Sequence, residues 1–301
     1  RCCAMWNRNV ETFLGCDGPF EESRIVLFGA PFDSTTSYRP GTRFASRTMR
    51  AESYGLETYS PYQDLDLEDA AVFDGGDLEL SFGNTEKALA DIAARARDIL
   101  AAGRLPFLIG GEHLVTLPAL RAAHEKYPDL AVVHFDAHTD LRKEYLDARL
   151  SHATVLRRIW DVVGDGRIHQ FGIRSGERAE WRWAAEGHTD LHRIDFQGLD
   201  EVLSGLRAAG RPVYLTIDLD VLDPSCFPGT GTPEAGGVTF AALLSAALRV
   251  IARTHVVACD LVELSPPLDP SGISTATALK LLREMLLALE RPHMGNRGHE
   301  A

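Results

Sequence analysis

Short, almost uninterrupted apolar runs alternate along this chain with longer stretches of helical periodicity. The runs, which we expect to be β-strands, cover residues 24–30, 105–109, 130–135, 168–173, 212–217 and 255–261. Runs that are apolar at every position, and not at every second one, are typical of strands buried on both faces of a parallel sheet. This pattern restricts the chain to folds in which both faces of the sheet are covered.

The stretches between the runs have the spacing of amphipathic helices. We expect helices over residues 84–102, 117–126, 153–163, 240–252 and 274–289. A chain that alternates strands with helices winds them into a mostly parallel sheet with helices on both faces. The pattern therefore predicts a three-layer αβα fold of the α/β class. No linker or internal repeat interrupts it, so we expect a single domain over residues 1–301.

The charge of the chain argues against one class of partner. Lys and Arg number 31 against 43 Asp and Glu, which gives a formal net charge of −12. Binding to nucleic acid needs a basic surface for the phosphate backbone, so no nucleic-acid partner is expected. An acidic surface is compatible with cationic substrates, and it is also common among soluble proteins of other kinds.

The cysteines favour a reducing compartment. They are Cys2, Cys3, Cys16, Cys226 and Cys259. Their odd number and irregular spacing give no disulfide framework and no Cys-x-x-Cys pair, and Cys259 is expected in the core. The chain has no secretory segment and no apolar run near the roughly 18 residues of a membrane span. We therefore expect a cytoplasmic protein with no membrane partner.

Unusual polar residues follow the apolar runs where the strands should end. Gly-Gly-Glu-His at 110–113 follows one run, residues 136–140 follow the next, Asp218 and Asp220 end a third, and Glu263 follows a fourth. In open α/β sheets, ligands bind outside the carboxyl ends of the strands. These residues therefore mark the expected site.

Metal-ligating residue types dominate this set. The candidates are His113, Asp136, His138, Asp140, Asp218 and Asp220. Within each acidic motif they are two residues apart, a spacing that puts side chains on one side of an extended strand end. Clustered carboxylates in a protein interior are costly unless a cation neutralises them. We therefore expect a metal site.

Two metal ions account for this set better than one. Four carboxylates and two imidazoles exceed the ligands of one tetrahedral zinc ion. Two ions with four protein ligands each need eight bonds, which these residues provide when two carboxylates bridge. Such a pair, about 3.5–4 Å apart, can hold one hydroxide between the ions.

An isolated Asp pair would more simply be a cap or a solvated turn. An EF-hand is excluded because Leu222 stands where an oxygen ligand is needed.

Two further residues are candidates for catalysis. His152 opens a helical stretch soon after the motif at 136–140, and alone it would be an ordinary residue of a helix start. Histidine titrates near neutral pH and can transfer protons. Glu263 follows an apolar run, and a carboxylate that emerges beside a metal pair must face a cavity or a partner.

These motifs resemble those of the arginase/agmatinase (ureohydrolase) family. The likeness is carried by Gly-Gly-Glu-His at 110–113, His-Phe-Asp-Ala-His-Thr-Asp at 134–140, Ser-His-Ala at 151–153, Thr-Ile-Asp-Leu-Asp-Val-Leu-Asp-Pro at 216–224 and Glu-Leu-Ser-Pro at 263–266. It covers a core of about residues 25–290, and Pro-Gly-Thr-Gly-Thr-Pro at 228–233 is most similar to agmatinases. Glu112 is a departure, because many members have Asp there.

The resemblance implies a hydrolase with two Mn²⁺ ions per subunit, in which a hydroxide that bridges the metals attacks a guanidinium group. One ion would be bound by His113, Asp136, Asp140 and Asp218, and the other by Asp136, His138, Asp218 and Asp220. Asp140, His152 and Glu263 would be catalytic, and Glu263 and His152 would also bind substrate. A sheet of about eight strands and a homo-oligomer, a trimer or a hexamer, are implied as well.

The expected substrate is agmatine, cleaved to putrescine and urea. Arginases follow the Asp-Ala-His-Thr-Asp motif with a loop rich in Asn, Ser and Thr that binds the α-amino acid groups, whereas residues 141–150 contain none of these. We expect Tyr38 to contribute to binding the substrate's amine.

Other functions remain open at this point. Aminopropylagmatine, guanidinobutyrate or formiminoglutamate could be the substrate, and Arg39, Arg43 or Arg142 could bind a carboxylate of the acidic ones. A non-catalytic regulator of the polyamine pathway is disfavoured, because such proteins commonly lose metal ligands and every candidate ligand is present here.

Overall fold

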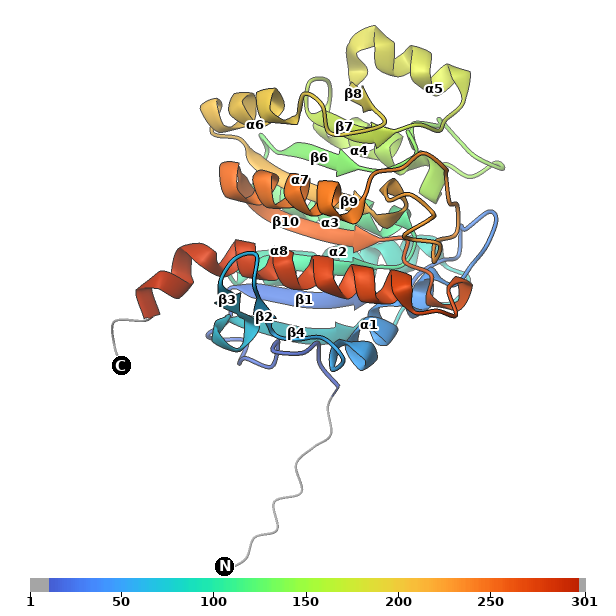
Figure 1. The fold of residues 1–301 in the computed structure, drawn as a ribbon. Helices are drawn as coiled ribbons and strands as arrows, with labels where there is room; N and C mark the ends of the chain where they lie inside the picture. Colours follow the sequence, from blue (N-terminus) through green and yellow to red (C-terminus); the bar gives the residue numbers. More distant parts are fainter. Residues whose placement is uncertain (1–10, 298–301) are drawn as a thin grey trace, which may run out of the picture.

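A single parallel sheet organises the chain. The structure is a computed structural model that describes residues 11–297, with side chains as far as Arg291. The eight strands run in the order β4-β1-β5-β10-β9-β6-β7-β8, and every neighbouring pair is parallel (Figure 1). Their bounds are β1 Ile25–Ala30, β4 Val72–Asp77, β5 Leu105–Gly110, β6 Ala131–Phe135, β7 Ile168–Ile173, β8 Asp190–Arg193, β9 Pro212–Asp218 and β10 His255–Val262.

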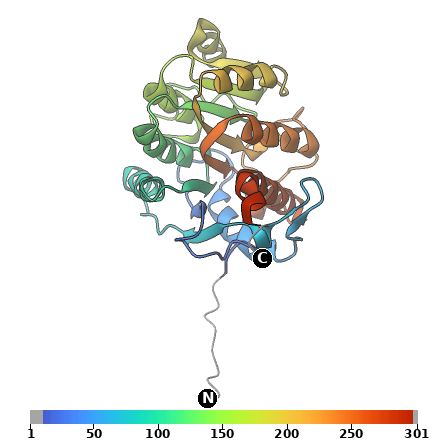
Figure 2. The ribbon, with the colours of Figure 1, turned by 90° about the vertical axis from the view of Figure 1, so that its left-hand side faces the viewer.

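Helices cover both faces of this sheet. On one face lie α1 (Ala45–Ser53), α6 (Leu199–Ala208), α7 (Phe240–Arg253) and α8 (Ile273–Arg297), and on the other lie α2 (Thr85–Ala101), α3 (Thr116–Lys126) and α4 (Val155–Val163). Figure 2 shows the three layers with the sheet between the two sets of helices. Each face has its own apolar cluster of buried side chains. The burial of strand residues on both faces explains why the strands are apolar throughout.

The predicted three-layer αβα fold is confirmed. Each expected strand is present with ends shifted by at most one residue, and Asn84 caps α2 by accepting a hydrogen bond from the Lys87 N–H at 3.0 Å. Two strands of the sheet were not predicted. β4 carries a Gly-Gly pair near its end, and β8 is a short polar strand at the sheet edge. The helices α1, α5 (Arg178–Trp183) and α6 were also missed.

Smaller features complete the described chain. A two-stranded antiparallel sheet joins β2 (Tyr59–Ser60) to β3 (Leu65–Asp66). Cys16, Cys226 and Cys259 are free, and Cys259 is buried in the core as expected. The expectations for Cys2 and Cys3 lie outside the described residues. Within the described part of the chain, none of the helices has the length and apolarity that crossing a membrane requires.

Candidate metal centre and active site

The candidate ligands meet at the carboxyl edge of neighbouring strands. β5, β10, β9 and β6 are consecutive in the sheet, so the residues that follow them share one edge. His113 begins a 3-10 helix (His113–Val115) soon after β5, Asp218 ends β9 and Asp136 follows β6. The topology therefore gathers residues that lie far apart in the sequence.

Three carboxylates converge on one nitrogen of His113. Its Nδ1 lies 3.1 Å from Asp136 Oδ2, 3.2 Å from Asp140 Oδ2 and 3.2 Å from Asp218 Oδ2. This nitrogen is buried and makes no hydrogen bond, whereas Nε2 lies 3.1 Å from the hydroxyl of Thr216. Ligands of an ion held at about 2.1 Å lie about 3 Å apart. The distances from His113 Nδ1 to the three carboxylates are therefore those expected between ligands of one cation, and we call these four residues the first ligand group.

A second ligand group adjoins the first and shares Asp136 with it. His138 Nδ1 lies 3.0 Å from Asp220 Oδ2 and 3.4 Å from Asp136 Oδ1. The two oxygens of Asp136 thus face different histidines, as a bridging carboxylate would. In both Asp136 and Asp218, Oδ1 also accepts the backbone N–H two residues on, from His138 at 2.6 Å and from Asp220 at 2.9 Å. Asp136, His138 and Asp220 are close enough to hold a second ion.

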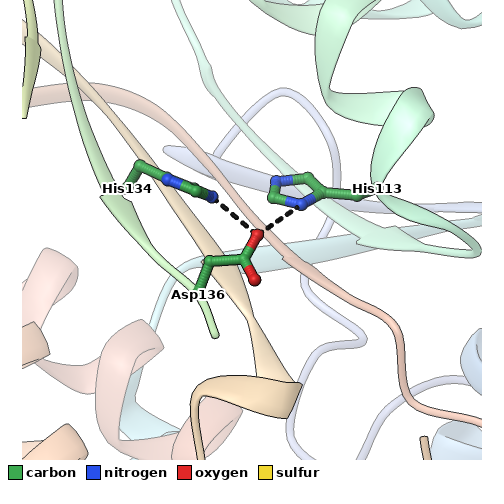
Figure 3. Close-up of side chains that lie close together, drawn as sticks. All are labelled: His113, His134 and Asp136. Carbon is green, nitrogen blue, oxygen red and sulfur yellow. Dashed lines mark hydrogen bonds and ion pairs between the residues drawn. The ribbon is translucent and has the colours of Figure 1, made fainter. Parts of the chain in front are cut away.

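His134 also contacts this cluster, although the sequence analysis did not select it. It is buried on β6, with Nε2 2.8 Å from Asp136 Oδ2 (Figure 3). Its Nδ1 lies 3.2 Å from the amide nitrogen of Gln170, which can only donate. The proton of His134 is therefore on Nε2, which donates to Asp136, and neither ring nitrogen is free for a metal. His134 orients a ligand instead, and its place two residues before Asp136 on the same strand is the signal that was overlooked.

The ligands converge for a reason other than the one the spacing suggested. We expected extended strand ends, but β6 stops at Phe135 and Asp140 has a left-handed backbone with φ of 52°. Asp220 lies in a 3-10 helix (Leu219–Val221). Tight turns aim these carboxylates. Glu180 holds one turn by accepting the Thr139 hydroxyl at 2.7 Å and the Leu141 N–H at 2.8 Å.

The electrostatics of the groups indicate that a cation belongs there. Burial, followed by repulsion from Asp136, raises the pKa of Asp140 to about 7. Burial, followed by repulsion from Asp220 and Asp136, also raises the pKa of Asp218 well above its usual range. Burial alone would lower the pKa of His113, but the surrounding carboxylates outweigh it and raise that pKa. Without a cation, these carboxylates cannot all ionise at low cost.

A cavity of about 330 Å³ opens beside both ligand groups. Ligand residues that line it are His113, His138, Asp140 and Asp218, and His152 and Glu263 line it too. The structure therefore brings the two candidate catalytic residues to the same space as the candidate metal ligands.

Glu263 is held in a strained position at the end of β10. Its backbone is left-handed, with φ of 67°, which costs a residue other than glycine about 1–3 kcal/mol and is typical of functional sites. Its Oε1 accepts the backbone N–H of His113 at 2.7 Å. Burial, followed by repulsion from Glu112, raises the pKa of its carboxyl well above the usual range. Glu263 is thus a buried acid that lines the cavity.

His152 is fixed at both ring nitrogens. Nδ1 lies 2.8 Å from the carbonyl oxygen of Thr35, which can only accept, so Nδ1 carries the proton. Nε2 is 3.2 Å from the Ser37 hydroxyl. Burial, with smaller contributions from the charges of His138 and His113, lowers the pKa of His152 to about 4. This pKa lies below the near-neutral value expected for a free histidine, chiefly because the imidazole is buried.

The mouth of the cavity differs from the expectation in one residue. Tyr38 is 70% exposed and does not line the cavity, because its ring lies against the guanidinium of Arg39. Tyr145 lines the cavity instead, with its ring 6.0 Å from that of His152. Glu177 also lines it and is largely exposed. An aromatic and an acidic group are thus present, but neither was selected from the sequence.

Of the three arginines considered for binding a substrate carboxylate, two form contacts away from the cavity. Arg39 donates to the carbonyl oxygens of residues 230 and 231, and Arg43 pairs with Asp33. Only Arg142 of the three lines the cavity, where it lies 3.3 Å from Glu177 Oε1.

Known proteins share this arrangement of sequence and fold. Residues 23–288 match the sequence profile of the Arginase family. The agmatinase of Bacillus anthracis is 47% identical over 279 residues, which cover 92% of this chain and 96% of that protein. The guanidinobutyrase of Pseudomonas aeruginosa is 35% identical over 279 residues, covering 88% of this chain and 86% of that protein. The crystal structure of the agmatine ureohydrolase of Thermoplasma volcanium is 31% identical, has a TM-score of 0.87 and covers 97% of each chain.

Proposed function

The chain belongs to the arginase family and is a ureohydrolase that acts on guanidino compounds, and we propose that it hydrolyses agmatine to putrescine and urea with two manganese ions. One observation carries this proposal. His113 Nδ1 faces three carboxylate oxygens at 3.1–3.2 Å, beside a cavity that also contains Glu263 and His152. The 47% identity to an agmatinase supports the choice of substrate.

The donor set fits two divalent cations. The four candidate carboxylates carry four negative charges when ionised, which two divalent ions would balance. The first ion would be bound by His113, Asp136, Asp140 and Asp218, and the second by Asp136, His138, Asp218 and Asp220. When bound, divalent metals bring the pKa of a water molecule from 15.7 to about 7. Oxygen-rich sites suit Mn²⁺, which supports manganese in the proposal although raw affinity favours zinc.

Glu263 would hold the substrate for attack. A guanidinium is a planar cation with N–H donors on its edge, and a buried carboxylate is a strong acceptor for it. Oε1 of Glu263 already accepts the His113 N–H, so Oε2 is the oxygen that remains for the substrate. Gly231 lies beside this oxygen, because a Cβ at Gly231 would contact Oε2 at 3.9 Å and would also lie 2.9 Å from the carbonyl oxygen of Arg39. Fixing the guanidinium in this way is itself catalytic.

Asp140 and His152 would manage the protons. The water oxygen bonds to the guanidinium carbon, the bond from that carbon to the alkyl-bearing nitrogen breaks, and this nitrogen leaves as an amine after gaining a proton. Asp140 lies in the first ligand group and lines the cavity, so it would orient the water. His152 would carry a proton to the leaving nitrogen. Its low pKa makes it a poor store of the proton but a ready donor once it has received one.

The far end of the substrate would meet an acidic, aromatic mouth. Agmatine ends in an ammonium group, for which Glu177 provides a carboxylate, while the ring of Tyr145 beside it already has the guanidinium of Arg142 4.3 Å from its centroid. Guanidinobutyrate, a second candidate, ends in a carboxylate that would have to compete with Glu177 for Arg142. We therefore place agmatine ahead of the acidic substrates. We also propose a single catalytic domain, a cytoplasmic location and a homo-oligomer, a trimer or a hexamer.

A direct assay tests this proposal. The purified protein would be loaded with Mn²⁺, and release of urea would be measured with agmatine, aminopropylagmatine, guanidinobutyrate and arginine. Agmatine is expected to give the highest kcat/KM. No urea from any of the four would contradict the proposal, and a clear preference for another compound would replace agmatine as the substrate.

A further inference from the structure

Glu112 directs its buried carboxylate away from the metal ligands and toward the loop that follows β1. Its side chain is fully buried, and Oε2 accepts the backbone N–H of Thr35 at 2.8 Å. The hydroxyl of Thr35 donates to Oε1, and the hydroxyl of Thr36 lies 3.3 Å from Oε2. One carboxylate therefore fixes this loop through its backbone and its side chains.

Thr35 in turn holds His152 through two hydrogen bonds. Its carbonyl oxygen accepts the proton on Nδ1 at 2.8 Å, and its hydroxyl oxygen accepts the backbone N–H of His152 at 3.1 Å. The hydroxyl has one proton, which it donates to Glu112, and it uses a lone pair to accept from His152. Thr35 thus holds both the start of the 3-10 helix His152–Thr154 and the ring of its first residue.

The two segments are also joined through their backbones. The N–H of Glu112 donates to the carbonyl oxygen of Phe32 at 2.8 Å. A Cβ at Gly111 would lie 1.8 Å from that oxygen, so only glycine permits the approach. The turn after β5 and the loop after β1 are therefore joined at the backbone, and the side chain of Glu112 extends this connection to Thr35.

We infer that Glu112 and Thr35 are positioning residues that hold His152 as the Nδ1-protonated tautomer, which leaves Nε2, 3.2 Å from the Ser37 hydroxyl, without a proton. This inference rests on the proposed role of His152 in proton transfer. The bond from Nδ1 to the Thr35 carbonyl selects the tautomer, because a carbonyl cannot donate. The bonds to Glu112 hold that carbonyl in place. Without them the ring is free to turn or to exchange its proton between the two nitrogens, and the fraction competent for transfer falls.

The test compares two neighbouring threonines that contact the same carboxylate. Thr35→Val removes the hydroxyl that links Glu112 to His152 and keeps the side-chain shape. Thr36→Val removes a hydroxyl that contacts Glu112 but, among the described residues, makes no hydrogen bond to His152. Thr35→Val is expected to lower kcat about 10–100-fold, as is typical when a supporting hydrogen bond is lost. Its KM and metal content should stay unchanged, Thr36→Val should behave like the parent, and Thr35→Ser, which keeps a hydroxyl, should recover most of the loss.

Two further measurements separate positioning from general stability. In a His152→Ala background, Thr35→Val is expected to cause no additional loss of kcat, since its effect passes through the missing ring. In protein loaded with diamagnetic Mg²⁺, nitrogen-15 NMR of the imidazoles reports which nitrogen of His152 carries the proton. The parent should show a protonated Nδ1, and Glu112→Gln should show a mixture of tautomers. The resonance is assigned by its absence in His152→Ala.

The outcomes are distinct. Equal losses of kcat in Thr35→Val and Thr36→Val, or an unchanged tautomer in both Thr35→Val and Glu112→Gln, would overturn the inference. Parent-like activity of His152→Ala would instead remove His152 from the proposed mechanism. The NMR comparison would still decide whether Glu112 and Thr35 set the tautomer, because it does not depend on turnover.

Discussion

The backbone N–H of His113 donates a 2.7 Å hydrogen bond to Oε1 of Glu263. The side chain of the same histidine faces the carboxylates of the first ligand group. A single residue thus sets the distance between the candidate metal ligands and the acid proposed to hold the substrate. The left-handed backbone of Glu263 is the cost of bringing its carboxylate back toward this N–H.

Replacement of Glu263 by Gln is expected to remove activity without disturbing the metal ligands. The amide oxygen of Gln can still accept the His113 N–H, but the negative charge that would bind a guanidinium is lost. A hydrogen bond to a charged group contributes about 1.5–3 kcal/mol, so kcat/KM for agmatine should fall at least about tenfold per lost bond. Urea release and metal content would be measured together. Near-parental kinetics would remove Glu263 from the site.

Removal of metal is expected to abolish activity and to lower the melting temperature. Buried carboxylates without a cation are costly to ionise, as shown by Asp140, whose pKa is raised to about 7 by burial and then by repulsion from Asp136. Chelator-treated protein and protein reloaded with Mn²⁺ would be compared by calorimetry and by urea release. Full activity after complete removal of metal would contradict a metal mechanism.

His113 and His134 offer a matched pair for the metal stoichiometry, since both contact the same oxygen of Asp136. His113→Ala should lose one of the two expected ions, because it removes a ligand. His134→Ala should retain both and bind them about 10–100-fold more weakly, because it removes only a residue that orients a ligand. Metal analysis after dialysis and titration with Mn²⁺ would check both. Loss of one ion from His134→Ala alone would reverse the two roles.

The interior of the fold was predictable, whereas its edges were not. Strands such as β5 and β9 are buried on both faces, so nearly every residue in them is apolar and indicates a buried strand. β8 lies at the sheet edge and is largely polar. β4 contains Gly75 and Gly76, which have no side chains to contribute to a hydrophobic pattern. Strands of these kinds have no hydrophobic period to detect.

The site was predictable in its residue types and less so in its geometry. The ligands could be selected because acids and histidines at the ends of apolar strands have few structural explanations. The conformation of Asp140 could not be predicted, because its turn is held by Glu180, which lies about 40 residues later in the chain, on α5. Tyr38 was expected in the site because of its loop, but the sequence alone does not show that Tyr145 is the tyrosine that lines the cavity.

The shifted pKa of His152 predicts how stability depends on pH. The folded protein has this pKa at about 4, below the value near 6.5 of an unfolded histidine. Between these values the unfolded chain binds a proton that the folded chain does not, so stability should decline as pH falls from about 6.5 toward 4. The melting temperature of the parent should drop more between pH 7 and pH 5 than that of His152→Asn. Equal drops would show that His152 has an ordinary pKa.

The same pKa predicts the effect of His152 on catalysis. His152 is neutral at neutral pH, so its replacement should lower kcat without removing a titration near pH 6.5. A lost proton-transfer group typically costs about 10²–10⁴ in rate. We expect His152→Ala to lower kcat to this extent at each pH from 6 to 9, with normal metal content. A parental rate and pH profile would leave His152 as a residue of the helix start alone.

Discrimination between agmatine and guanidinobutyrate should depend on Glu177 and Arg142. Arg142 is the one Arg or Lys that lines the described cavity, and its Nη1 lies 3.3 Å from Glu177 Oε1. A substrate carboxylate would have to take Arg142 from Glu177, whereas a substrate ammonium can share Glu177 with it. Arginine meets the same obstacle, and residues 141–150 supply no Asn, Ser or Thr to bind its α-carboxylate. Burying that group without partners is unfavourable.

Glu177→Gln should therefore change kcat/KM in opposite directions for agmatine and for guanidinobutyrate. Agmatine loses an exposed ion pair of about 0.2–1 kcal/mol, so its kcat/KM should fall by a factor of up to about five, mostly through KM. Guanidinobutyrate gains access to an Arg142 that has lost its closer carboxylate, Glu177, and keeps Glu180 Oε2 at 3.7 Å from its Nε, so its kcat/KM should rise. Glu144→Gln is a control, since Glu144 does not line this cavity. An equal fall for both substrates would mean that Glu177 supports the shape of the mouth, and a higher kcat/KM for arginine than for agmatine in the parent would overturn the substrate assignment.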